Sequence, residues 1–129
     1  MINHWDSDRW LFFEPQELLS PGGLTMLQRG VFLLDADSVD ALCKLRTLLA
    51  RPVIVNSRAA GLSFRGYRSP SENDVVGGAP FSFHIQGKAF DITVRGLEVT
   101  EIAKAAFDAG FTYTKTISST SLHIDTRGA

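Results

Sequence analysis

The sequence holds a single cysteine, Cys43, and only three histidines. One cysteine cannot form a disulfide within the chain, and it cannot build a metal site from thiolate ligands. Because Cys43 lies in a helical pattern, we expect it to be a small buried apolar residue. Any metal site in this protein must therefore rest on histidine and carboxylate side chains.

An excess of one charge is also missing, and so are long hydrophobic runs. Lys and Arg number 13 against 14 Asp and Glu, so the net charge of −1 gives no electrostatic reason to propose nucleic acid or an acidic membrane as a partner. No run approaches the roughly 20 apolar residues that span a membrane. The N-terminus has neither the basic nor the apolar region of a signal peptide. We therefore expect synthesis in the cytoplasm without a signal peptide.

The composition that remains is typical of an ordinary globular domain, with 44% apolar and 21% charged residues in a chain of 129. Apolar residues at helical spacing predict two main helices, at residues 37–50 and 99–109. Short β-branched or alternating runs predict four strands, at residues 52–56, 89–94, 113–117 and 122–126. This order predicts an α+β fold, in which the two main helices pack against a small, mainly antiparallel sheet. No feature of the sequence indicates an oligomeric state.

Residues 1–30 differ from the rest, and we expect an irregular, aromatic-rich N-terminal arm before a single domain at residues 31–129. One short helical turn is predicted near residues 15–19, followed by a turn at residues 20–23. The aromatic side chains of the arm either cap the core of their own domain or dock on a larger assembly, such as a virion; they are Trp5, Trp10, Phe12 and Phe13. A second irregular segment, residues 57–80, is predicted to be a long loop, and loops of this length are usually functional or disordered.

Two of the three histidines lie in strand-like segments beside carboxylates, His84 before Asp91 and His123 before Asp125. Two histidines and one carboxylate suit a catalytic zinc ion that keeps a fourth position open for water. An isolated Asp91 would more often face solvent, and a single buried histidine is more often structural. Burying Asp91 among apolar neighbours, however, would require a partner or a metal ion. Gly87 allows the chain to turn back from His84 towards Asp91.

Two further residues are candidates for a role in catalysis. Asp125 follows His123 by two residues, so on a strand both side chains project from the same face. It either accepts a hydrogen bond from His123 and orients it, or acts as a general base, or is a surface residue paired with Arg127. Arg68, in the turn at residues 66–70, offers a planar guanidinium to a carboxylate or to a developing oxyanion. Standing alone, it would be read as a solvated loop arginine.

Several motifs together resemble the zinc D-Ala-D-Ala carboxypeptidase family, a group of peptidoglycan peptidases whose fold is shared by the hedgehog signalling domain. The motifs are Gly66-Tyr67-Arg68-Ser69-Pro70, Asn73, Val76-Gly77-Gly78-Ala79-Pro80, Ser82-x-His84-x-x-Gly87-x-Ala89-x-Asp91 and His123-Ile124-Asp125. The resemblance implies one zinc ion, held by His84, Asp91 and His123. It also implies that Arg68 binds the carbonyl or carboxylate of the substrate, and that Ser82 supports the substrate site.

The resemblance implies hydrolysis of a peptide bond in peptidoglycan stem peptides, of the DD-carboxypeptidase or endopeptidase type. Compact relatives without signal peptides are typical of phages and prophages, so release by a holin, or delivery as a virion component, would bring the protein to the cell wall.

Two features depart from the family pattern. Thr120 stands where several catalytic members carry an acidic general base, and Asp125 is the nearest substitute. Residues 58–65 resemble an insertion that forms a lip on the substrate groove. A non-catalytic zinc module, structural or wall-binding, is therefore the alternative.

Overall fold

A computed structural model of the chain describes residues 4–55, 57–58, 62–63, 66–75, 83–84 and 86–128. Its centre is a four-stranded antiparallel sheet in the order β1-β4-β6-β5. The strands are β1 (Ile54–Val55), β4 (Ala89–Thr93), β5 (Tyr113–Thr116) and β6 (Leu122–Asp125). The sheet confirms the α+β class expected from the sequence, and each strand lies within its predicted range. Within the described residues, no helix is both long enough and apolar enough to cross a membrane.

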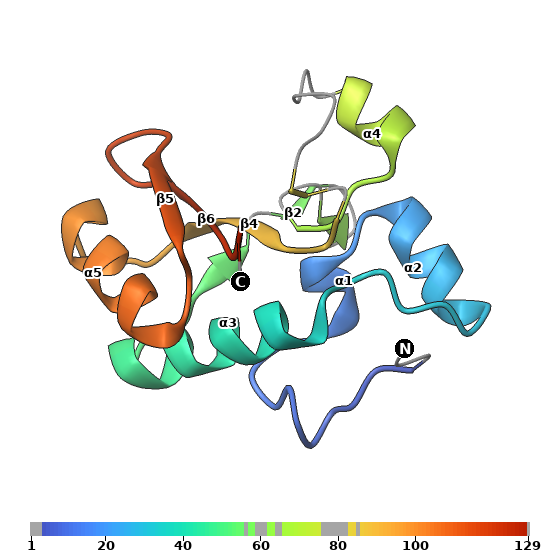
Figure 1. The fold of residues 1–129 in the computed structure, drawn as a ribbon, viewed down its shortest axis with the longest axis horizontal. Helices are drawn as coiled ribbons and strands as arrows, with labels where there is room; N and C mark the ends of the chain where they lie inside the picture. Colours follow the sequence, from blue (N-terminus) through green and yellow to red (C-terminus); the bar gives the residue numbers. More distant parts are fainter. Residues whose placement is uncertain are drawn as a thin grey trace.

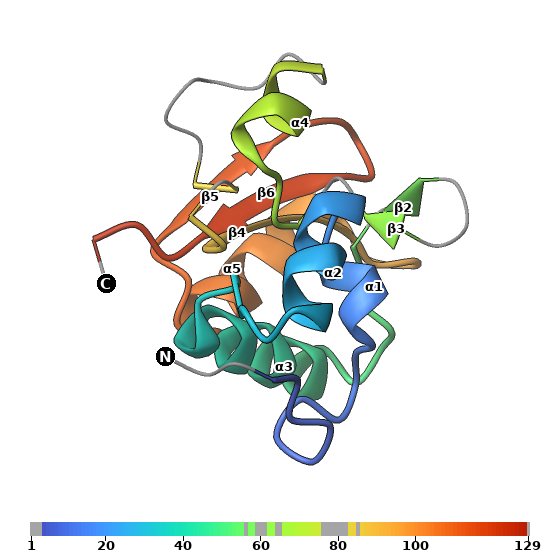
Figure 2. The same cartoon turned by 90° about the vertical axis from the view of Figure 1, so that its right-hand side faces the viewer.

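The two main helices, α3 (Ala36–Leu49) and α5 (Val99–Ala109), lie side by side on one face of the sheet (Figures 1 and 2). The bounds of α5 are those predicted, because Gly110 adopts a left-handed conformation (φ 116°) and ends the helix there. Helix α3 begins one residue before the predicted start, because the carboxylate of Asp35 accepts a hydrogen bond from the backbone N–H of Ser38 (3.1 Å).

Along β4 and β6, side chains point alternately into the core and to the opposite face of the sheet. Phe90 and Ile92 on β4 pair with Ile124 and Leu122 on β6, and all four side chains belong to the buried hydrophobic core. The residues between them project from the other face, because successive side chains of a strand point to opposite sides. That face carries no main helix (Figures 1 and 2), and it holds the polar residues considered below.

The N-terminal segment contains more helix than we predicted. The short turn is confirmed as α1 (Pro15–Leu18), but a second helix, α2 (Pro21–Gln28), replaces the predicted turn at residues 20–23. Ser20 caps α2 by accepting a hydrogen bond from Gly23 N (3.2 Å), and Pro21 suits the first helical position. The two glycines that suggested a turn instead allow Tyr67 and Glu72 to approach the helix closely.

The aromatic residues of this segment pack into the core. Trp10 is fully buried and stacks on Phe32, with ring centroids 5.1 Å apart, and Phe13 is also buried. For these two side chains, capping of their own core is confirmed, whereas Phe12 stays partly exposed. The domain division at residue 30 stays a prediction.

The long loop predicted at residues 57–80 contains regular structure. Strands β2 (Ser57–Arg58) and β3 (Leu62–Ser63) form an antiparallel pair, and α4 (Pro70–Val75) follows. Helix α4 begins with a reciprocal cap, in which Ser69 Oγ accepts from Glu72 N (3.2 Å) and Glu72 Oε1 accepts from Ser69 N (2.9 Å). The Ser-Pro-Ser-Glu sequence at residues 69–72 carries this signal, and the loop prediction overlooked it. A lip formed by residues 58–65 stays a prediction.

Candidate metal centre

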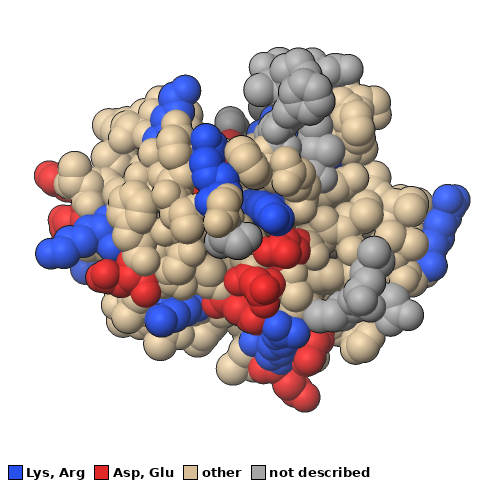
Figure 3. Space-filling model, in the orientation of Figure 1, with Lys and Arg blue, Asp and Glu red and all other residues tan. Residues whose placement is uncertain are grey.

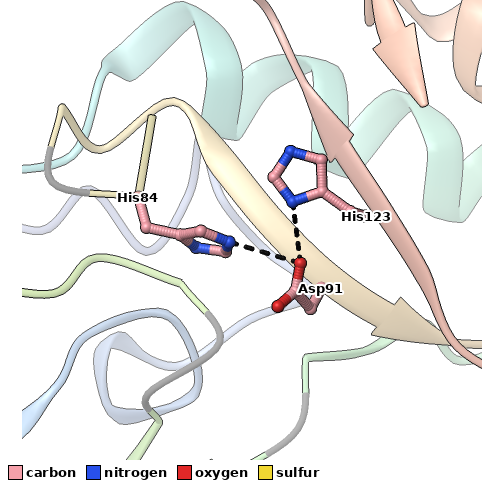
Figure 4. A group of neighbouring side chains, drawn as sticks. All are labelled: His84, Asp91 and His123. Atoms are coloured by element: carbon pink, nitrogen blue, oxygen red, sulfur yellow. Dashed lines mark hydrogen bonds and ion pairs between the residues drawn. The ribbon is translucent and has the colours of Figure 1, made fainter. Parts of the chain in front are cut away.

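The structure brings together the three residues predicted as metal ligands. One carboxylate oxygen of Asp91, Oδ1, lies 3.2 Å from His84 Nε2 and 2.9 Å from His123 Nδ1. Figure 4 shows both imidazole rings directed at this oxygen from two different segments of the chain. The three potential ligand atoms all lie within 4.8 Å of one another. Asp91 is buried rather than exposed, so the solvent-facing alternative is wrong.

The register between β4 and β6 explains how Asp91 and His123 come together. Asp91 on β4 lies directly opposite His123 on β6, and both project from the face of the sheet away from the core. Directly opposed residues of an antiparallel pair have their Cβ atoms about 4.5–5.5 Å apart, so their side chains meet. The pairing of the two strands thus fixes one side of the cluster.

A tight turn supplies the other side. Gly87 donates its N–H to the carbonyl of His84 (3.2 Å) and has a positive φ of 69°. A Cβ atom at Gly87 would come within 2.2 Å of the carbonyl oxygen of Leu33, so only glycine fits there. As the sequence suggested, Gly87 turns the chain back from His84 into the strand that carries Asp91.

A hydrogen bond fixes the protonation pattern of the His84 ring. Its Nδ1 lies 2.9 Å from the carbonyl oxygen of Gly66, and a carbonyl can only accept. In the neutral ring Nδ1 therefore carries the proton, and Nε2 presents a lone pair to Asp91 Oδ1 at 3.2 Å. Two lone-pair donors at this distance suit a shared cation, either a proton or a metal ion. The donor set on this side therefore fits a metal ion.

His123 is held between two carboxylates. Its Nδ1 faces Asp91, and its Nε2 lies 2.7 Å from Oδ2 of Asp125. Asp125 has no exposed surface and lies on the opposite side of the His123 ring from Asp91. With a proton on Nε2 donated to Asp125, Nδ1 is left as a lone-pair donor on the side of the cluster. A carboxylate behind a ligating histidine is a common arrangement in metal sites.

The charges of the cluster are strongly coupled. Burial alone would raise the pKa of Asp91, but hydrogen bonds with His123 and His84 outweigh it and hold that pKa well below its usual range. Burial lowers the pKa of His123, but Asp91 and Asp125 together raise it above its ordinary value. The two carboxylates therefore favour the protonated form of His123. A divalent cation would have to displace that proton, which makes binding dependent on pH.

Arg127 is the residue that sequence reasoning missed as a contributor to this site. The predicted pair with Asp125 forms, but Asp125 is fully buried, so its interpretation as a surface residue is wrong. Arg127 Nε lies 2.9 Å from Asp125 Oδ1, and Nη2 lies 2.7 Å from Oδ2. These bonds outweigh the effect of burial and lower the pKa of Asp125. The available signal was a second charge two residues after Asp125.

Arg68 is tied to His84 through the backbone. Its N–H donates to the carbonyl of His84 (3.3 Å), two residues after Gly66, which accepts from the His84 ring. Arg68 as a whole residue is only 7% exposed. Thr120, at the position expected for an acid, is exposed in the turn between β5 and β6. Ser82 lies outside the described residues, as do residues 76–80 of the motifs.

Comparison with known proteins adds one positive finding. A model of the peptidase M15 family matches residues 14–125 of the chain. The match covers all three residues of the cluster as well as Arg68 and Asp125, and it stops two residues before Arg127. No curated protein matches the chain.

Proposed function

Because the chain belongs to the peptidase M15 family, whose members are zinc-dependent metallopeptidases, we propose that it hydrolyses a peptide bond in the stem peptides of bacterial peptidoglycan. The observation that carries this proposal is the cluster of His84, Asp91 and His123. It offers two imidazole lone pairs and a carboxylate within 4.8 Å of one another, on a sheet face without a main helix. Three protein ligands leave room for a further ligand, as in catalytic zinc sites.

A zinc ion bound there would lower the pKa of a coordinated water towards 7 and would polarise the scissile carbonyl. The protein supplies the orientation. The Gly66 carbonyl fixes the proton of His84 on the nitrogen that faces away from the cluster, and Asp125 does the same for His123. Both rings then present a lone pair towards Asp91 without rearrangement, which favours metal binding.

Arg68 is our candidate for binding the substrate. Its backbone N–H donates to the carbonyl of His84, which carries one candidate ligand, and the residue is buried instead of lying on an exposed loop. A guanidinium in that position would bind a substrate carboxylate or stabilise the negative charge that develops on the scissile carbonyl oxygen. Figure 3 shows basic side chains over the area where Figure 1 draws β5, β6 and the C-terminal end, with acidic side chains below. This distribution suits a substrate that bears carboxylates.

For Asp125, the contacts favour the orienting role over the role of general base. Both of its oxygens already accept hydrogen bonds, from His123 and from Arg127, and the whole residue is buried. A general base must reach the proton that it removes. Asp125 instead reaches the far nitrogen of His123, from which it would influence the metal through the ring.

The experiment is incubation of purified, zinc-loaded protein with bacterial sacculi and with synthetic stem peptides. We expect new amino groups, and mass spectrometry of the fragments distinguishes release of a terminal D-alanine from an internal cut. Chelation should stop the reaction and zinc should restore it. His84→Ala is the matched inactive control, because it removes one ligand and leaves Arg68 and Asp125 in place. Wild-type protein that binds zinc but releases nothing from either substrate would contradict the peptidase proposal.

The second candidate, a non-catalytic zinc module that binds the wall or stabilises an assembly, is favoured by one observation. Thr120 is not an acid, and Asp125, the nearest substitute, is engaged with His123 and Arg127. This candidate predicts that zinc raises the melting temperature and that sacculi sediment the protein, but that no fragment is released. The same incubation therefore separates the two functions.

A further inference from the structure

We propose that Arg127 is a positioning residue of the metal centre, which holds Asp125 against His123 and ties the His84 turn to the sheet. The inference rests on the proposed function in one respect, because it takes the cluster to be a zinc site. Arg127 lies beyond the residues matched by the family comparison. Its role is inferred from the geometry of the C-terminal segment.

The guanidinium of Arg127 bonds both oxygens of the buried Asp125 carboxylate. Arg127 donates to Asp125 through Nε (2.9 Å to Oδ1), Nη2 (2.7 Å to Oδ2) and its backbone N (3.0 Å to Oδ1). A fully buried carboxylate requires a compensating charge, and the planar guanidinium matches both of its oxygens. Asp125 Oδ2 also faces His123 Nε2 at 2.7 Å, so one oxygen is shared by the arginine and the histidine. Any shift of the guanidinium therefore moves the atom that orients the His123 ring.

The second line of evidence is contact with two aromatic rings from different segments. The Cζ atom of Arg127 lies 3.5 Å from the ring centroid of Tyr113 and 4.6 Å from that of Phe83. Tyr113 is the register partner of Asp125 on the neighbouring strand, and Phe83 immediately precedes His84. Arg127 thus contacts the strand pair that carries His123 and, through Phe83, the turn that carries His84. It therefore contacts the segments that carry both histidines of the cluster.

The planar shape of arginine is essential to this role. A lysine keeps the positive charge, but its ammonium group cannot bond both carboxylate oxygens in a fork while it stacks on aromatic rings. We therefore expect Arg127→Lys to share most of the defect of Arg127→Met. A general effect of charge would instead let the lysine variant behave like wild type.

The chain contains a control pair whose carboxylate, Asp40, is 40% exposed, whereas Asp125 is buried. Arg9 makes the same kind of fork to Asp40 (2.8 and 2.6 Å) and lies over the ring of Trp10. The side chains of Arg9 and Arg127 are similarly exposed, at 39% and 40%. Arg9 has no contact with the cluster in the described part of the chain. Arg9→Met therefore reports what is lost when such a pair is broken elsewhere.

The test measures the zinc affinity of the full chain by competition with a chromophoric chelator, for wild type, Arg127→Met, Arg127→Lys and Arg9→Met. We expect both Arg127 variants to bind zinc about 10- to 100-fold more weakly, the range found when a group supporting a ligating histidine is removed. Arg9→Met should bind like wild type. A second measurement is the His123 Nε2–H proton in NMR spectra of the zinc-loaded protein. It should be protected from exchange in wild type and exchange rapidly in the Arg127 variants.

Each outcome decides the question. Unchanged affinity and an unchanged His123 signal in Arg127→Lys would overturn the inference, even if Arg127→Met fails to fold. Equal losses in Arg9→Met and Arg127→Met would also overturn it, because the effect would then be one of stability alone. A wild-type protein that binds no zinc would overturn the proposed function and this inference together. Zinc binding with wild-type affinity in both Arg127 variants overturns only the inference.

Discussion

His84 and His123 reach the same oxygen of Asp91 from two differently built regions. His84 stands on a turn, and a neutral backbone carbonyl 18 positions away in the sequence supports its ring. His123 stands on a strand, and a charged carboxylate two positions away, itself held by an arginine, supports its ring. One support depends on how distant segments dock, whereas the other is local and ionic. The two should therefore fail in different ways when they are perturbed.

The largest effect is expected for Asp91, because it contacts both histidines and its loss affects both regions alike. Asp91→Asn removes a ligand charge and the partner of both rings, so zinc affinity should fall by more than about 100-fold, beyond the range for residues that only support a ligand. Competition with a chelator measures it. Asp108→Asn, an exposed change on α5, is the control. Affinity within a few-fold of wild type in Asp91→Asn would exclude Asp91 as a ligand.

A smaller loss is expected on the His123 side. Asp125→Asn keeps the shape of the side chain but loses the charge, and we expect zinc affinity to fall by about 10- to 100-fold. Activity should fall at least partly through that loss, so saturating zinc should recover part of it. If affinity is unchanged while kcat collapses at saturating zinc, Asp125 is a general base, and the orienting role is wrong.

On the His84 side, the expected effect is mainly on folding. A Cβ atom at Gly66 would lie 2.1 Å from the carbonyl oxygen of Leu18. Gly66→Ala must therefore move the backbone whose carbonyl supports His84, with a loss of about 1–3 kcal/mol in the free energy of unfolding, as for other overpacked sites. Urea titration of the zinc-free protein measures it.

Gly30→Ala is the control for this change, because nothing lies within 4 Å of a Cβ at Gly30, although its φ is positive. It should lower stability without weakening zinc binding. Gly66→Ala should lower both. Normal zinc affinity in folded Gly66→Ala would show that the carbonyl is not needed to orient His84.

The smallest effect concerns Glu72, which braces the segment that carries Gly66 and Arg68. Burial raises the pKa of Glu72, but hydrogen bonds from Ser20, Ser69 and Gly22 outweigh it, and the pKa is lowered from 4.5. A lowered pKa means that the ionised form stabilises the folded state. That contribution is fully present above about pH 4.5 and is lost as the pH falls through the folded-state pKa.

Wild type should therefore be more stable than Glu72→Gln at neutral pH, and the difference should shrink as the pH falls below about 4.5. Urea titrations of both zinc-free proteins between neutral and acidic pH test the sign. The His123 NMR signal should stay unchanged in Glu72→Gln at neutral pH, because Glu72 contacts the segment that supports His84 and not the one that supports His123. A stability difference that grows towards low pH would contradict this account.

Local signals explain the parts of the fold that could be predicted. Helix α5 was predicted with its observed bounds, because its apolar spacing and the glycine that ends it lie within the segment itself. Helix α2 was missed for the opposite reason. Its two glycines are poor helix formers, and contacts with Tyr67 and Glu72, which lie more than 40 positions away, stabilise a helix there instead of a turn.

The sequence by itself determined which residues were available for a metal site. With one cysteine and three histidines, of which two lie in strand-like segments near carboxylates, His84, Asp91 and His123 were the natural set. Only the tertiary structure decided that Asp91 lies opposite His123, that the Gly66 carbonyl meets His84, and that Asp125 faces the far side of the His123 ring. The physical reason is that strand register and the docking of a turn are set by packing across the whole sheet. Local spacing specifies only that Asp125 and His123 share a face of their strand. No local pattern specifies that Asp91 meets His123 or that the Gly66 carbonyl meets His84.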